Sequence, residues 1–332
     1  MSPTDAILAE LRSPGARKYY PPGFTAYLDS CDTVLEHSAN VGGCVVTVRV
    51  FMPASDATPV FRQSVKRLFH RAATLVSDPF FDIAVRRSAL TVNIVPSPAR
   101  RMFPAPGEPI GPENLNGGFT YVPMPMDGAA GAGAAGAGGT ADIYILRREE
   151  MSKVTLHELI HHSRVHTDDA AWNPILPEIY RVFGIQTAGC PHACTTDIRP
   201  NEALVEFWAT LYHSKCLSKE YNIPLATLVA AERDHAIAQA AHLEAHRRTL
   251  ATGAGNAAPL WNERTHAYSY IRLRALMLAD LPEFIAAFPQ PPYDPVAVGR
   301  WLIKKAATAT APTDNRTYTH NSSLKMTLLG NL

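Results

Sequence analysis

The chain has 332 residues, of which 46% are hydrophobic, and 31 basic against 30 acidic residues give a formal net charge of +1. The apolar content supports substantial cores in one or two domains, and the balanced charge indicates neither a nucleic-acid-binding nor a membrane-surface protein. Because the chain has no apolar run of about 18 residues, no secretory signal pattern and only five cysteines, we expect an intracellular, mostly reduced protein without a membrane partner.

Strands are predicted in the first half of the chain and helices in the second. Alternating and β-branched residues predict the strands, at 44–51, 89–97, 117–124 and 141–146. Apolar residues at helical spacing predict a helix at 59–78, and a shorter helical segment is expected at 4–12. Beyond residue 147 the pattern is that of helices and loops, so the predicted fold class is α+β.

These patterns divide the chain into four expected parts. They are an N-terminal extension at 1–40, a strand-rich N-terminal lobe at 41–165, a helical C-terminal lobe at 166–308 and a polar, disordered tail at 309–332. The Gly/Ala-rich segment 127–140 is expected to be a flexible insertion in the first lobe. Its GxGxxG spelling does not indicate a dinucleotide site, because that fingerprint follows a strand and opens a helix.

The segment 154–162, VTLHELIHH, contains His157 and His161 with Glu158 beside the first of them. Residues four apart lie on one face of a helix, about 6 Å apart along its axis, so the two imidazoles can bind one zinc ion. Glu158 next to that face can act as general base on a water molecule. A histidine-rich helix surface is the alternative, but the apolar helical spacing around the motif favours a metal site.

A catalytic zinc needs a third protein ligand and an open fourth position. The metzincin class is excluded, because Arg164 and Thr167 stand where its glycine and its third histidine are required. One source of the third ligand is the segment that follows the motif directly, which offers His166, Asp168 and Asp169.

The other source is a predicted helix at 201–213, where Glu202 and Glu206 lie four residues apart. Apolar residues, among them Phe207 and Trp208, occupy the other sides of this helix. Two acids that face inward beside such residues are costly unless they are paired or bind a metal. A solvated acidic stripe is the alternative interpretation.

The pair HELIH and NEALVE resembles the gluzincins, in which HExxH is followed by a helix of the form N-E-A-x-x-D/E. The resemblance implies a zincin fold, with an edge strand above the active-site helix and a helical lower lobe. It also implies that His157, His161 and Glu202 bind zinc. Glu158 would then be the general base, and Glu206 would orient the first histidine.

A narrower resemblance covers 113 to about 275. ENLNGGFT, the HExxH helix with its preceding strand, NEALVEFWA and THAYSYIRL are similar to segments of metallopeptidases encoded by large nucleocytoplasmic DNA viruses. This resemblance implies a viral or virus-derived protein, present in the host cytoplasm or the virion. Gluzincins stabilise the oxyanion with a His or Tyr of the helical lobe. The predicted helix at 263–276 offers His266, Tyr268 and Tyr270, of which Tyr270 and His266 are the preferred candidates, and aromatic core packing is the alternative. NLNGGFTYV would supply the edge strand that pairs with the substrate backbone.

Two interpretations remain open for the cysteines and three for the function. Cys190, His192 and Cys194 either bind a second metal ion or form a loop with free thiols or a local disulfide. The first functional hypothesis is a zinc metalloendopeptidase with a peptide or protein substrate and no nucleic-acid partner. The second is a virion or assembly protein on a zincin scaffold with structural zinc; Glu158 favours the enzyme, because a structural site needs no general base. The third function, a zinc-free helical interaction protein, requires both the histidine pair and the acid pair to be accidental. The oligomeric state is not indicated.

Overall fold

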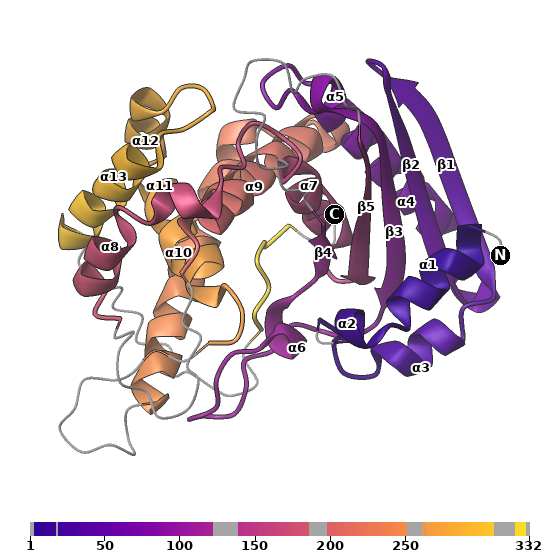
Figure 1. Cartoon of the computed structure of the whole chain (residues 1–332), viewed down its shortest axis with the longest axis horizontal. Coiled ribbons are helices and arrows are strands. Elements are labelled where there is room, and N and C mark those ends of the chain that lie inside the picture. Colours follow the sequence, from indigo (N-terminus) through magenta and orange to yellow (C-terminus); the bar gives the residue numbers. More distant parts are fainter. Residues whose placement is uncertain are drawn as a thin grey trace. The chain divides into compact units, whose positions relative to one another are not determined.

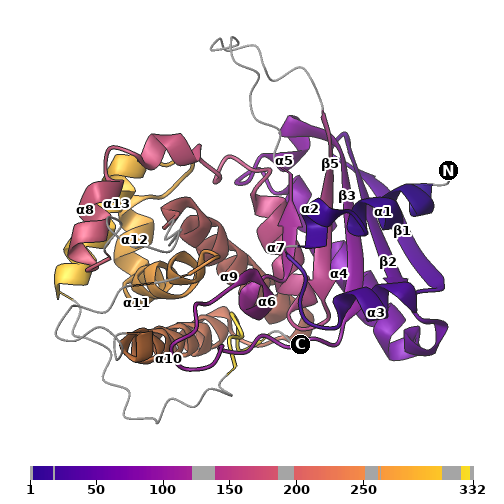
Figure 2. The same ribbon diagram turned by 60° about the horizontal axis from the view of Figure 1, so that its bottom comes forward.

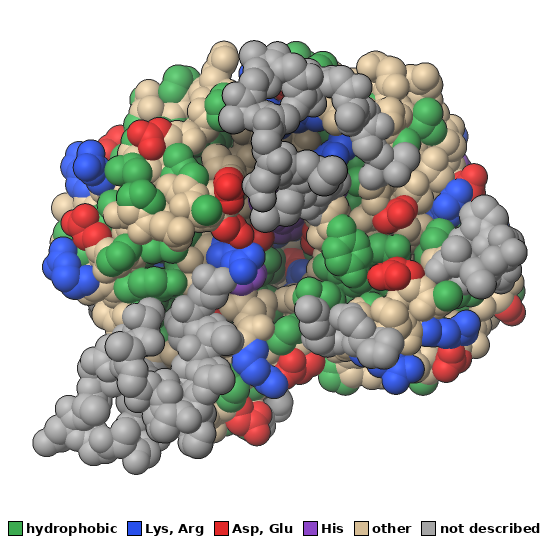
Figure 3. Space-filling view, viewed as in Figure 1, with side chains coloured by type: hydrophobic (Ala, Val, Ile, Leu, Met, Phe, Trp, Pro, Cys, Tyr) green, Lys and Arg blue, Asp and Glu red, His purple; other side chains and the backbone are tan. Residues whose placement is uncertain are grey.

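The computed structural model describes residues 3–17, 19–121, 139–185, 198–250, 261, 263–308 and 323–329. The chain forms two compact units: unit 1 comprises Met1–Arg100 and Asn116–Arg164, and unit 2 comprises Arg101–Leu115 and Val165–Leu332. Within the described ranges, no helix combines the length and the apolar character needed to cross a membrane. On the face seen in Figure 3, the basic and acidic side chains of the described residues are interspersed, in keeping with the balanced net charge.

Unit 1 is built on a five-stranded mixed sheet in the order β1-β2-β3-β5-β4. Its strands are β1 (Thr33–Val41), β2 (Cys44–Met52), β3 (Arg87–Ser97), β4 (Gly118–Thr120) and β5 (Gly139–Arg147). β1 and β2 form an antiparallel hairpin, in which Gly42 and Gly43 both take positive φ angles, 59° and 91°. β2, β3 and β5 run parallel, whereas β4 pairs antiparallel with β5 and lies at the edge of the sheet.

Helices cover both faces of this sheet (Figures 1 and 2). They are α1 (Pro3–Leu11), α2 (Pro14–Arg17), α3 (Phe24–Asp29), α4 (Pro59–Ser77), α5 (Ile83–Arg86) and α7 (Met151–Ile160), with a short 3-10 turn, η1, at Ala54–Asp56. On one face, the buried Phe24 and Leu28 of α3 pack in a cluster with Phe51 and Leu146 of the sheet. On the other face, α4 packs against β1 and β2, and α7 packs against α4, β4 and β5.

Unit 2 is helical. Its elements are α6 (Pro112–Leu115), the 3-10 helix η3 (Asp169–Trp172), α8 (Leu176–Val182), α9 (Pro200–Tyr221), α10 (Leu225–Leu250), the π-helix η4 (Ser269–Leu273), α11 (Arg274–Ala279), α12 (Leu281–Ala287) and α13 (Pro295–Thr308). α9, α10, η4 and α11 pack against one another, and α13 packs against α8 and η3. The predicted α+β class is therefore confirmed: a mixed sheet, a helix that carries HxxxH, and a helical part.

Two segments near the ends of the chain pack within the units. Residues 1–40, expected to be an N-terminal extension, include α1–α3 and most of β1, which belong to unit 1. The alternation of apolar and polar residues in β1 is weak. This edge strand alternates half-buried and exposed residues and has no fully buried position, so its sequence does not require an apolar residue at every second position. Within the expected disordered tail, residues 323–329 are described and packed, with Leu324 and Met326 buried. The Gln239 side chain donates to the carbonyls of Ser323 and Lys325, both at 3.1 Å, so backbone polar groups of this segment are satisfied by α10.

Candidate metal site

The helix α7 is buried almost all round, since every residue from Met151 to Ile160 except Ser152 is buried. Its preceding residue, Glu150, takes a left-handed conformation with φ 59°, which is uncommon for a residue other than glycine. The Arg71 guanidinium of α4 donates to the Ser152 hydroxyl at 2.8 Å and ties the two helices together. α7 therefore holds His157 and Glu158 in a packed setting, and His161 directly follows its last residue.

The two histidines of the motif have the separation that a shared metal ion requires. Their Nε2 atoms lie 3.2 Å apart, their ring centroids are 4.9 Å apart, and the rings are nearly perpendicular. Two nitrogens bound about 2.0–2.1 Å from one tetrahedral zinc ion are about 3.3–3.4 Å apart, so the observed spacing fits. The same spacing is that of an N–H···N hydrogen bond, which can hold the two rings in the metal-binding orientation before an ion binds.

The third member of the group is Glu202, in the first turn of α9. Pro200 begins this helix, where a missing N–H costs nothing, and an acidic residue in the first turn is stabilised by the helix dipole. One ligand atom from each of His157, His161 and Glu202 lies within 4.8 Å of the other two, and all three residues are buried. Two imidazoles and one carboxylate are a common zinc ligand set, so these residues form a candidate metal site.

His166, which the sequence offered as a possible third ligand, is held by a different contact. The Asn201 side-chain oxygen accepts from the backbone N–H of Thr167 at 2.9 Å, which fixes the orientation of the amide. The amide nitrogen of Asn201 therefore donates to Nδ1 of His166, also at 2.9 Å. In the neutral ring the proton then lies on Nε2, so neither nitrogen offers a lone pair to a metal ion while this bond stands.

Asp168 and Asp169 also have partners other than a metal ion. Asp168 precedes η3, and its carboxylate accepts from the Ala170 N–H at 2.9 Å. Asp169 forms an ion pair with Arg199 at 3.0 Å. Neither belongs to the metal-ligand group that the described residues form. These contacts favour Glu202, and not Asp168 or Asp169, as the third metal ligand.

Glu206, one turn after Glu202, lies in a buried ion pair. Its Oε1 is 3.1 Å from Nη1 of Arg274, and the two side chains are 3% and 0% exposed. Arg274 also donates to the carbonyl of Met326. Burial lowers the pKa of Arg274 to about 10, which still leaves it cationic at neutral pH. The predicted contact of Glu206 with His157 stays a prediction. The arginine itself was not predicted, although a cation in the apolar run IRLRALML was a visible signal.

Of the two candidate oxyanion-stabilising residues, Tyr270 lies in η4, which packs against α9, and His266 lies in the bend before it. Tyr270 is in the π-helix η4, and its backbone N–H donates to the His266 carbonyl at 3.0 Å. The backbone N–H of Arg199, just before α9, donates to the Ser269 hydroxyl at 3.0 Å, which ties the start of α9 to η4. His266 and Tyr270 are half-buried, whereas the residues between them are buried. π-helical turns occur frequently at functional sites, which is consistent with a role for Tyr270.

The edge strand β4 is closely attached to the motif helix. A Cβ atom at Gly118 would lie 2.6 Å from the Tyr144 carbonyl oxygen and 3.2 Å from the Val154 side chain, so only glycine permits this approach. At the other end of β4, the Thr120 hydroxyl lies 2.8 Å from Nε2 of His162, the buried residue after His161. His162 was not predicted to have a role, although its place directly after the motif was a visible signal.

No family model matches the chain, and searches of curated proteins and of solved structures find no match either. The possible second metal site at Cys190, His192 and Cys194 lies outside the described residues, and so does most of the expected flexible insertion at 127–140. The candidate metal site therefore rests on its own geometry and donor chemistry.

Proposed function

We propose that the protein is a zinc-dependent metallopeptidase of the gluzincin type, with His157, His161 and Glu202 as the metal ligands. The observation that carries the proposal is the 3.2 Å separation of the two histidine Nε2 atoms in a buried group completed by a carboxylate. Zinc fits this donor set of two neutral nitrogens and one oxygen. A bound zinc ion supplies Lewis acidity, which polarises a carbonyl group and lowers the pKa of water.

In this proposal Glu158 is the general base. This residue is 6% exposed and lies on α7 next to the first ligand. The carboxylate accepts a proton from the water that attacks the peptide carbonyl, and it delivers that proton to the leaving amine nitrogen. The Tyr270 hydroxyl, or else the His266 ring, donates a hydrogen bond to the carbonyl oxygen as negative charge develops on it.

The peptide substrate binds along β4. This strand is at the edge of the sheet, so an extended peptide can add to it by backbone hydrogen bonds. The hydrogen bond between Thr120 and His162 fixes the position of the edge strand relative to the end of the motif. The substrate is therefore an unstructured or extended polypeptide segment.

Metal content and cleavage together test the proposal. Elemental analysis should find about one zinc per chain, Glu202→Ala should lose most of it, and Asp168→Ala should retain it. Glu158→Gln keeps the size and the hydrogen-bonding capacity of the side chain, so it should bind zinc as the wild type does. Its kcat/KM on an unfolded protein should fall by at least about a hundredfold.

Two outcomes would contradict the proposal in different ways. Equal zinc loss in Asp168→Ala and Glu202→Ala would contradict the ligand assignment. A wild-type protein that binds zinc but cleaves nothing in a broad peptide library would instead support a virion or assembly protein with structural zinc.

A further inference from the structure

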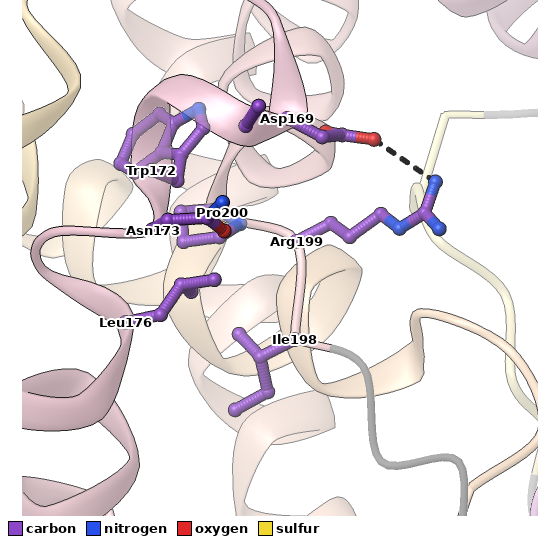
Figure 4. A pocket seen from close by; sticks show the side chains of 8 residues that line it. Asp169, Trp172, Asn173, Leu176, Ile198, Arg199 and Pro200 are labelled. Carbon is purple, nitrogen blue, oxygen red and sulfur yellow. Dashed lines mark hydrogen bonds and ion pairs between the residues drawn. The ribbon is translucent and has the colours of Figure 1, made fainter.

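A pocket of about 250 Å³ lies in unit 2, beside the first turn of α9 (Figure 4). Its apolar lining comes from Trp172, Leu176, Ile198 and Pro200, and the polar part comes from Asp169, Asn173 and Arg199. Trp172 and Ile198 are almost completely buried, with 1% and 0% exposure, so the pocket has a fixed apolar floor. None of these residues is used in the proposed reaction.

The size of the pocket limits its ligand. An apolar cavity of about 150 Å³ accepts a benzene molecule, whereas pockets for drug-sized ligands begin at about 300 Å³. A pocket of about 250 Å³ therefore has room for one large side chain, such as a phenyl or indole group, and not for a larger organic cofactor.

The charge of the pocket limits the ligand further. Among the described residues that line it, the charged ones are Asp169 and Arg199, and they pair with each other at 3.0 Å. These two side chains are 44% and 39% exposed, which places the ion pair at the rim of the pocket; Figure 4 shows the pair to one side of the apolar side chains. Because the pair has no net charge and the floor is apolar, the pocket favours a neutral apolar group over a charged one.

Hydrogen bonds connect the pocket to Asn201, the residue before the proposed ligand Glu202. The Trp172 indole N–H donates to the Thr167 hydroxyl at 2.9 Å, and that hydroxyl lies 3.2 Å from the Asn201 side-chain oxygen to which it donates. Asn201 directly precedes Glu202 on α9. Pro200, which lines the pocket, and Glu202 both lie in the first turn of α9, so the pocket wall and the proposed ligand belong to the same helical turn.

We propose that this pocket receives one large apolar side chain of the peptide substrate, preferably aromatic, and so sets the cleavage specificity. The inference rests on the proposed peptidase function, but the pocket's affinity for an aromatic side chain does not depend on turnover. Arg199 and Asp169 at the rim then flank the peptide backbone and supply a hydrogen-bond donor and an acceptor.

Two pocket-filling variants and one matched control test the proposal. Leu176→Trp fills the pocket from α8, and Asn173→Trp fills it from an exposed position that carries little risk for folding. Glu178→Trp places the same side chain at an exposed position of α8 that does not line the pocket. The probe is N-acetyl-L-phenylalanine amide, and its binding is followed by ligand-observed NMR. It should bind the wild type, Glu178→Trp and the inactive Glu158→Gln, and not the two filled variants.

Cleavage-site profiling in a peptide library is the second readout. The wild type should favour an aromatic residue at one position near the cleaved bond, and both filled variants should lose that preference by at least about tenfold. Cleavage with the same preference in all variants would overturn the proposal, and so would a wild type that neither binds the probe nor prefers an apolar residue. Probe binding that the filled variants abolish, in a protein that cleaves nothing, would keep the pocket and reject the peptidase function.

Discussion

Because the ion pair between Glu206 and Arg274 is buried, breaking it should cause a large loss of stability. Glu206→Leu would leave the Arg274 guanidinium in a site where its side chain is 0% exposed. Breaking a buried pair in this way typically costs about 3–5 kcal/mol. Attraction from Glu232, which raises the pKa of Arg274 against the effect of burial, places the expected cost towards the lower end.

Tryptophan fluorescence is a suitable assay, because all four tryptophans, at 172, 208, 261 and 301, lie in unit 2 with the ion pair. For a unit of this size, about 1 kcal/mol shifts Tm by about 2–4 °C. Glu206→Leu should therefore lower Tm by roughly 6–20 °C. The double variant Glu206→Leu, Arg274→Met removes both charges of the pair. It leaves the Met326 carbonyl without its donor, at about 1–3 kcal/mol, and it removes the attraction between Arg274 and Glu232. A double variant less stable than Glu206→Leu would refute this reasoning.

The same variants separate the ion pair from the predicted role of Glu206 towards His157. If the carboxylate orients that histidine, Glu206→Leu should weaken zinc binding about 10–100-fold. Arg274→Met keeps the carboxylate, so it should lose stability but retain zinc affinity. Equal loss of zinc affinity in the two single variants would show that the fold, and not the carboxylate, controls the metal.

Three further predictions concern the parts around the site. Gly118→Ala would place a Cβ 2.6 Å from the Tyr144 carbonyl oxygen, so urea denaturation should show a loss of about 1–3 kcal/mol, and unchanged stability would contradict the close approach of β4. Asn201→Ala removes the partner of Thr167 and His166 from a buried position, and it should also cost about 1–3 kcal/mol by thermal denaturation, whereas a shift below about 0.5 kcal/mol would contradict the network. A chelator should lower the Tm of the wild type, because zinc at a hundred times its Kd would stabilise the folded protein by about 2.7 kcal/mol. The Tm of Glu202→Ala should not change when the chelator is added.

The sequence predicted those elements whose signal is local. The strand at 44–51 was recognisable from its run of β-branched residues, and the helix at 59–78 from apolar residues at helical spacing, which are buried in α4. β1 was not predicted because it is an edge strand. One of its faces is only half-buried, so its sequence lacks a clear alternation of apolar and polar residues. Residues 323–329 were hidden for another reason: Glu232, His235 and Gln239 of α10 satisfy the polar groups of this segment, and no property of the segment alone reveals these partners.

In the site too, local contacts could be predicted from the sequence, whereas contacts between distant residues could not. His157 and His161 are one helical turn apart, so their shared face follows from local geometry, and the structure places their nitrogens 3.2 Å apart. The arginine that pairs with Glu206 is 68 positions away, and the asparagine that holds Thr167 is 34 positions away. The burial of an acid on α9 therefore predicts that it has a compensating group, but not which one. The two acids on that helix have different partners: Glu202 belongs to the metal-ligand group, and Glu206 pairs with Arg274, which is cationic at neutral pH. The Arg274 guanidinium compensates the buried carboxylate of Glu206, and in the proposed site a metal ion would compensate that of Glu202.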